Sequence, residues 1–130
     1  MNTTCPTPSD IKLHTKSRLL ELIYSDGERY ELSCEYLRVY SPSAEVKGHG
    51  VGQEVLQVGK TNVTINAIEP VGNYALQLVF SDGHNSGIYS WDYLYQLATN
   101  KEAWWQNYLQ RLNKAGASRD PDIQVVKIGS

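Results

Sequence analysis

Histidine and cysteine are the side chains of this sequence best suited to hold a metal or to act as a nucleophile. The three histidines are His14, His49 and His84, and the two cysteines are Cys5 and Cys34. A non-haem iron oxygenase needs two histidines and one carboxylate on one face of the iron. None of the three histidines has an acid two positions later, so the usual start of that ligand set is missing. The sequence therefore argues against oxygenase chemistry.

A zinc site is a second possibility, because histidine nitrogen and cysteine sulfur are common zinc ligands. Cys34, His49 and His84 are scattered along the chain, without the close spacing of zinc-binding motifs. Our leading interpretation is that His84 is an exposed turn residue and that the protein has no cofactor. A metal- or cluster-binding protein that uses His84 with His49 and Cys34 is the alternative.

Nucleophilic catalysis has one cysteine candidate within the expected domain, Cys34. It falls at the first turn of an expected helix, where a thiolate gains from the helix dipole. Its counterpart in a similar, later segment is Trp91, so we interpret Cys34 as a small buried side chain. The sequence has no Gly-x-Ser-x-Gly elbow, and its Gly-x-Gly at 48–50 lacks the lysine of a phosphate-binding loop. We expect no enzymatic activity.

Two segments of the chain, residues 20–37 and 76–94, align with each other if one residue is inserted after a shared Ser-Asp-Gly. Each begins with apolar residues at every second position, which is typical of a strand with one buried face. Ser-Asp-Gly predicts a tight turn into a second, shorter strand. Each segment then has a serine and, two residues later, an acid. This pattern favours helix starts at Ser33 and Ser90.

The two strand–turn–strand–helix repeats predict an α+β fold, with a small mixed or antiparallel sheet covered by helices. Pro42 should end the first helix, and Gly116 should end a last helix that Asn100 caps. We expect a single domain over residues 15–115, with flexible segments at 1–14 and 116–130.

The composition is that of an ordinary soluble domain, with 41% hydrophobic residues, 20% charged residues and a net charge of -2. A protein that grips nucleic acid usually carries a basic excess, which this sequence lacks. The apolar runs are too short to cross a membrane, and the opening residues lack the apolar core of a secretory signal. We expect a cytoplasmic protein, monomeric or weakly dimeric, that binds neither nucleic acid nor membrane.

Aromatic residues with a polar tip are unusually frequent, with nine tyrosines and three tryptophans against one phenylalanine. Half-buried packing over a small sheet is one explanation. A protein-binding surface is the other, because tyrosine and tryptophan suit interfaces. The candidate interaction surface comprises four tyrosines near the expected helices: Tyr36, Tyr40, Tyr93 and Tyr95.

Two blocks of the sequence resemble a known family: LRVYSPSAEVKGHG at 37–50 and AIEPVGNYALQLVFSDGHNSGIYSWDYL at 67–94. It is the bacterial family of unknown function built on the N-terminal domain of γ-butyrobetaine hydroxylase. The resemblance extends over residues 15–112. It implies a domain without the iron and 2-oxoglutarate sites, which belong to a following domain of the hydroxylase. Related domains fused to P-loop ATPases imply an accessory module that binds an unidentified protein partner, a metabolic enzyme or an iron–sulfur assembly factor.

The same resemblance bears on metal binding. In the hydroxylase domain three cysteines and one histidine hold a structural zinc, and the matching positions here are Ser41, Ser43, Val46 and His84. A neutral serine hydroxyl is a poor replacement for a thiolate on zinc. The resemblance therefore implies a domain that has lost its zinc and keeps His84 in a structural or surface role.

Overall fold

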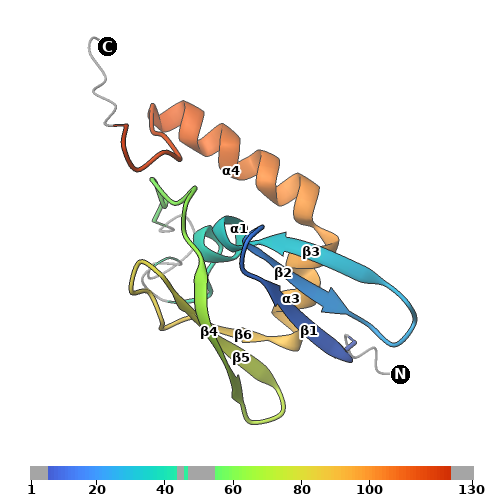
Figure 1. Cartoon of the computed structure of the whole chain (residues 1–130). Coiled ribbons are helices and arrows are strands. Elements are labelled where there is room, and N and C mark those ends of the chain that lie inside the picture. The colour runs from blue at the N-terminus through green and yellow to red at the C-terminus, as the bar shows by residue number, and fades with distance from the viewer. Residues whose placement is uncertain (1–5, 44–45, 47–54, 124–130) are drawn as a thin grey trace.

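The computed structural model of the chain describes residues 6–43, 46 and 55–123. Within these residues the chain forms two antiparallel sheets of three strands each and three helices, which confirms the α+β class (Figure 1). The expectation of one small sheet is corrected. Each expected hairpin pairs with a third strand that lies just before it in the chain, so two sheets form from sequential neighbours.

The first sheet has the order β1-β2-β3, and its strands are β1 (Asp10–His14), β2 (Leu19–Ile23) and β3 (Arg29–Ser33). β1 lies inside the segment 1–14 that was expected to be flexible. Its polar residues alternate with Ile11 and Leu13, which pack against the core. This alternation is typical of a strand, and it begins directly after the Thr- and Pro-rich start of the sequence.

The second sheet has the order β4-β5-β6, and its strands are β4 (Ile65–Val71), β5 (Ala75–Phe80) and β6 (Ile88–Ser90). Leu76 of β5 pairs with Tyr89 of β6, and both side chains are buried. Their neighbours on the strands point to the other face of the sheet, where Ile88 is exposed.

The two Ser-Asp-Gly turns have the same local structure. In the first turn the side chain of Asp26 accepts a hydrogen bond from the backbone N–H of Glu28 at 3.0 Å. In the second turn Asp82 accepts from the N–H of His84 at 3.2 Å. The glycine after each aspartate has a left-handed φ, 92° and 90° respectively, which favours glycine at that position. The same local turn therefore forms in the first hairpin with Glu28 at the position that His84 occupies in the second.

A serine N-cap begins each of the first two described helices, α1 (Cys34–Val39) and α3 (Trp91–Thr99). Ser33 and Ser90 each accept a hydrogen bond from the N–H three residues later, at 3.0 Å and 3.1 Å. These are the helix starts that the sequence predicts.

The third described helix, α4 (Lys101–Ala115), ends at Gly116 with a left-handed φ of 67°, as predicted. The side chain of Asn100 does not cap it, contrary to expectation. Its amide nitrogen instead donates to the carbonyl of Gln96 at 2.9 Å, which satisfies the end of α3. None of the described helices is long and apolar enough to cross a membrane.

One hydrophobic core joins both sheets to α1 and α3. Much of the tyrosine excess is buried in this core or, for Tyr108, in a smaller cluster with Val39 and Leu112. Tyr36, Tyr89 and Tyr108 are fully buried, and each hydroxyl donates to a backbone carbonyl from a distant part of the chain. Tyrosine thus fills core volume and also satisfies carbonyls that a phenylalanine would leave unpaired.

The residues after α4 return to the body of the domain, although the segment 116–130 was expected to be flexible. Arg119 donates to the two carboxylate oxygens of Glu35 at 2.6 and 2.8 Å. The backbone N–H of Thr61 donates to the carbonyl of Arg119 at 3.0 Å. The buried carboxylate of Glu35 needs a charged partner, and Arg119 supplies it.

Candidate functional site

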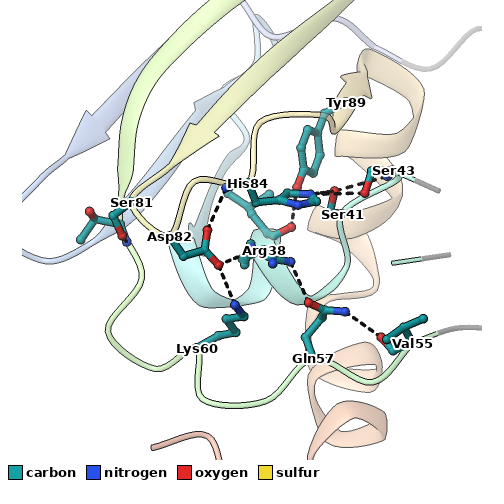
Figure 2. A network of polar contacts seen from close by, with 12 residues as sticks. Arg38, Ser41, Ser43, Val55, Gln57, Lys60, Ser81, Asp82, His84 and Tyr89 are labelled. Carbon is teal, nitrogen blue, oxygen red and sulfur yellow. Dashed lines mark hydrogen bonds and ion pairs between the residues drawn. The ribbon is translucent and has the colours of Figure 1, made fainter. Parts of the chain in front are cut away.

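His84 lies beside two serines from the loop that follows α1 (Figure 2). Its Nε2 atom is 2.9 Å from the Oγ of Ser41 and 3.3 Å from the Oγ of Ser43. The helix ends before Pro42, and this stop turns the chain so that both serine side chains meet the imidazole. Three of the four positions that the resemblance connects with zinc therefore do lie together.

The residues at these positions do not fit a zinc ion. Zinc takes about four nitrogen, sulfur or carboxylate ligands, whereas the donors here are one imidazole and two neutral hydroxyls. Val46 is buried and has no donor atom. Among residues 6–43, 46 and 55–123, no three histidine, cysteine, aspartate or glutamate side chains are grouped so that they could hold a metal ion.

Close packing also restricts the space around Ser41. A Cβ atom added at Gly87 would lie 2.4 Å from the Oγ of Ser41 and 3.2 Å from the ring of Tyr89. Gly87 therefore lets the second hairpin approach the loop of Ser41 closely.

An ion-pair network extends from the turn of His84. Asp82 accepts from the Nε of Arg38 at 2.9 Å and from the Nζ of Lys60 at 2.7 Å, as Figure 2 shows. Arg38 also donates to the side chain of Gln57 at 3.0 Å. We call this set, with Ser41 and Ser43, the His84 network.

The electrostatics of the network favour the ionised form of the Asp82 carboxyl group. Burial alone would raise the pKa of its carboxyl group. Hydrogen bonds from Lys60, the His84 N–H and Arg38 outweigh that effect and lower the pKa to about 2. The network thus fastens the end of α1, the loop near Lys60 and the β5–β6 turn to one another.

The other candidate metal ligands lie elsewhere. Cys34 is 1% exposed, and burial raises the pKa of its thiol, so it is a poor nucleophile near neutral pH. This confirms the prediction of a small buried side chain. His14 contacts Glu21 on the first sheet at 2.9 Å. His49 lies outside the described residues.

The predicted tyrosine surface is partly wrong. Tyr36 is buried, with its hydroxyl donating to the carbonyl of Leu97 at 2.7 Å, and so it cannot line a surface. Tyr95 packs edge-on against Tyr24 and Tyr30, whose ring centroids lie 5.6 and 6.4 Å away. Tyr40 and Tyr93 lie elsewhere, on a half-buried part of the molecular surface.

Tyr40 and Tyr93 line a cavity of about 390 Å³ between the end of α1, α3 and α4. The hydroxyl of Tyr93 donates to the carbonyl of Tyr40 at 2.6 Å, and the hydroxyl of Tyr40 donates to the carbonyl of Trp104 at 2.6 Å. These bonds fix the rings. We call this hollow the aromatic cavity, and its lining includes Tyr40, Tyr93, Gln96, Trp104, Asn107 and Arg111.

Four of these lining residues are absent from the sequence-based candidates. A signal for them exists, because Trp104, Asn107 and Arg111 follow one another at helical spacing on α4. Tyr93 and Gln96 are similarly spaced on α3. The sequence shows that each set shares a helix face, but it does not show that the two faces meet.

Comparison with known proteins finds a match to the family model described as "Gamma-butyrobetaine hydroxylase-like, N-terminal", over residues 11–95. Two structures solved by NMR in solution are 54% and 53% identical, with TM-scores of 0.81 and 0.78. The first alignment covers 96% of this chain and 98% of the other, and the second covers 100% and 99%.

A third similar structure is a crystal structure from Acidithiobacillus ferrooxidans, a protein of unknown function in the DUF971 family. It is 39% identical, has a TM-score of 0.60, and its alignment covers 71% of this chain and 92% of the other. A search of curated proteins found none that matches the chain.

Proposed function

This chain belongs to the γ-butyrobetaine hydroxylase-like N-terminal family, and from that premise we propose that it is a non-catalytic accessory module that binds another protein. The proposed contact surface is the aromatic cavity. In keeping with the family resemblance, we propose that the partner is a metabolic enzyme or an iron–sulfur assembly factor. We propose that binding takes place in the cytoplasm.

The observation that carries the proposal is the half-exposed aromatic lining of this cavity. The ring centroids of Tyr40 and Trp104 are 5.6 Å apart, and those of Tyr93 and Trp104 are 6.5 Å apart. Rings held in fixed positions lose little conformational entropy when a partner binds, and tyrosine and tryptophan are frequent in the energetically dominant parts of interfaces. A cavity of about 390 Å³ has room for a side chain of the partner.

The state of the polar groups around His84 supports a non-catalytic role. Asp82 is held by Arg38 and Lys60, while the imidazole faces two serine hydroxyls. A general base or nucleophile would need to reach a substrate, but these groups are engaged in joining parts of the fold. Metal binding through His84 and Cys34 has no comparable support, because the two side chains contact different groups.

Site-specific photocrosslinking tests the proposal. A benzophenone amino acid in place of Asn107 or Gln96, both exposed at the cavity, should crosslink the same partner protein in cells. The same amino acid in place of Asn66, which is exposed on β4, is the matched control. Crosslinking at Asn107 or Gln96 that is no stronger than at Asn66, or that yields unrelated proteins at the two cavity positions, would contradict the proposal.

A further inference from the structure

Among the described residues that line the aromatic cavity, Arg111 is the one basic side chain, and no described carboxylate pairs with its guanidinium. Its Nε atom is buried and has no hydrogen-bond partner. No carboxylate of the described residues lies within 4.0 Å of its nitrogen atoms. Two other arginines of the domain differ in this respect, because Arg38 pairs with Asp82 and Arg119 pairs with Glu35. The Nε is enclosed by the protein, so an acceptor from outside the chain would pair with the terminal nitrogens of the guanidinium, at the side where Arg111 lines the cavity.

The surroundings of Arg111 favour an anion. Gln96 and Asn107 are neutral amides, and none of the described side chains that line the aromatic cavity is acidic. A neighbouring hollow of about 440 Å³ continues along α4 from Asn107 to Lys114, again without an acidic side chain among its described lining. After Glu102 the sequence of α4 contains no further acid. A negatively charged partner would therefore be attracted by Arg111, and no described acidic side chain along this helix face would repel it.

The shape of the site favours a carboxylate next to an apolar group. The Cζ atom of Arg111 lies 5.7 Å from the centroid of the Tyr40 ring. Two adjacent side chains of a bound peptide could therefore contact the charge and the aromatic wall at the same time. The planar guanidinium matches a carboxylate through two parallel hydrogen bonds. Nucleic acid or a phosphorylated segment would favour several cations around one site, whereas the described lining of the aromatic cavity holds one, Arg111.

We infer that the aromatic cavity binds an acidic peptide segment of the partner, in which a carboxylate pairs with Arg111 and an adjoining aromatic or aliphatic side chain packs against Tyr40, Tyr93 and Trp104. This inference rests on the proposed function, because it names the chemistry by which the partner is recognised. The carboxylate supplies the negative charge that no described residue places against Arg111.

The test uses synthetic peptides as probes and NMR of the full chain as the measurement. The probe is acetyl-Gly-Ser-Glu-Phe-Ser-Gly-amide, and matched peptides replace its glutamate by glutamine or its phenylalanine by alanine. The Glu-Phe peptide should shift the signals of Trp104 and Arg111 side chains. It should bind about fivefold or more tightly than the Gln-Phe peptide, because only the carboxylate makes a charge-assisted pair. The Glu-Ala peptide should bind more weakly as well.

Variants of Arg111 assign the preference to this side chain. Arg111→Gln should remove the preference for glutamate, and Arg111→Lys should keep part of it because the charge is retained. Lys16→Gln is the charge-matched control, since Lys16 is exposed in the β1–β2 turn, and it should leave the preference unchanged. Thermal unfolding of each variant verifies that it is folded.

Three outcomes overturn the inference: equal binding of the glutamate and glutamine peptides, a preference that survives in Arg111→Gln, or no shift of cavity signals with any peptide. None of them overturns the proposed function, which is decided by crosslinking at Asn107 and Gln96. Conversely, a glutamate preference that depends on Arg111, together with failed crosslinking in cells, would retain the binding chemistry and remove the proposed partner.

Discussion

The Nε2 atom of His84 and the Oγ atom of Ser41 lie 2.9 Å apart, although 43 positions separate them in the sequence. This contact joins the turn between β5 and β6 to the loop after α1. The family resemblance connects both positions with zinc ligands. In this chain hydrogen bonds from His84 to Ser41 and Ser43 connect the two segments.

We expect His84→Ala to lower the free energy of unfolding by about 1–2 kcal/mol, because Ser41 and Ser43 lose a partner in a mostly buried place. Glu28→Ala is the matched control, because Glu28 occupies the same position in the first turn and is exposed. Its effect should stay within about 0.5 kcal/mol. Urea unfolding of both variants measures the difference, and equal effects would show that the contacts of His84 contribute nothing specific.

Gly87 and Ser41 should show strong energetic coupling. In Gly87→Ala the new methyl group meets the Oγ of Ser41 at 2.4 Å, and such overpacking typically costs about 1–3 kcal/mol. Ser41→Ala removes that oxygen, so the double variant should be more stable than the sum of the two single effects predicts. A double-mutant cycle by urea unfolding measures this. Simple additivity would contradict the close approach.

The local chemistry of the sequence predicts the turns and the helix starts well. Asp26 and Asp82 accept the N–H two residues later, and Ser33 and Ser90 cap helices, because each of these interactions involves residues only a few positions apart. Structure that depends on distant residues is harder to predict. Tyr36 is a surface candidate by residue type, but it is buried, and the carbonyl that receives its hydroxyl belongs to Leu97, far along the chain.

In the candidate site, too, some contacts follow from the sequence and others depend on how distant segments pack. The resemblance connects Ser41, Ser43 and His84, and the structure brings these three side chains together. The contact between Arg111 and the ring of Tyr40 depends on how α4 packs against the end of α1. No pattern within either segment of the sequence specifies that packing.

Asp82 should make the stability of the domain dependent on acidic pH. Its pKa is about 2 in the folded protein and 3.8 for an ordinary aspartate. Because the folded pKa is the lower one, the carboxylate stabilises the fold above about pH 4. That stabilisation, up to about 2 kcal/mol, disappears as the pH falls through the interval from about 4 to 2.

Asp82→Asn should therefore lower the unfolding free energy at pH 7 and have little effect near pH 2. Asp26→Asn is the matched control, since Asp26 makes the same turn bond and forms none of the salt bridges seen at Asp82. Urea unfolding as a function of pH measures both variants. A difference between wild type and Asp82→Asn that is the same at pH 7 and pH 2.5 would contradict the role of the charge.

Cysteines at the positions that the resemblance connects with zinc should create a zinc site. The triple variant Ser41→Cys, Ser43→Cys and Val46→Cys would place three thiols at the positions that the family resemblance connects with zinc, two of them beside His84. A Cys₃His set is a common structural zinc site, and metal binding would stabilise the folded state. We expect one zinc per chain by elemental analysis, together with a higher melting temperature that a chelator reverses.

The quadruple variant that adds His84→Ala is the control for this experiment, and it should bind zinc more weakly because one ligand is gone. A single Ser41→Cys variant should bind little, since two ligands do not make a closed site. Zinc binding by the triple variant that is unaffected by His84→Ala would show that the metal sits elsewhere. His84 would then not be a ligand of that metal, and its bonds to Ser41 and Ser43 would be an independent feature of this chain.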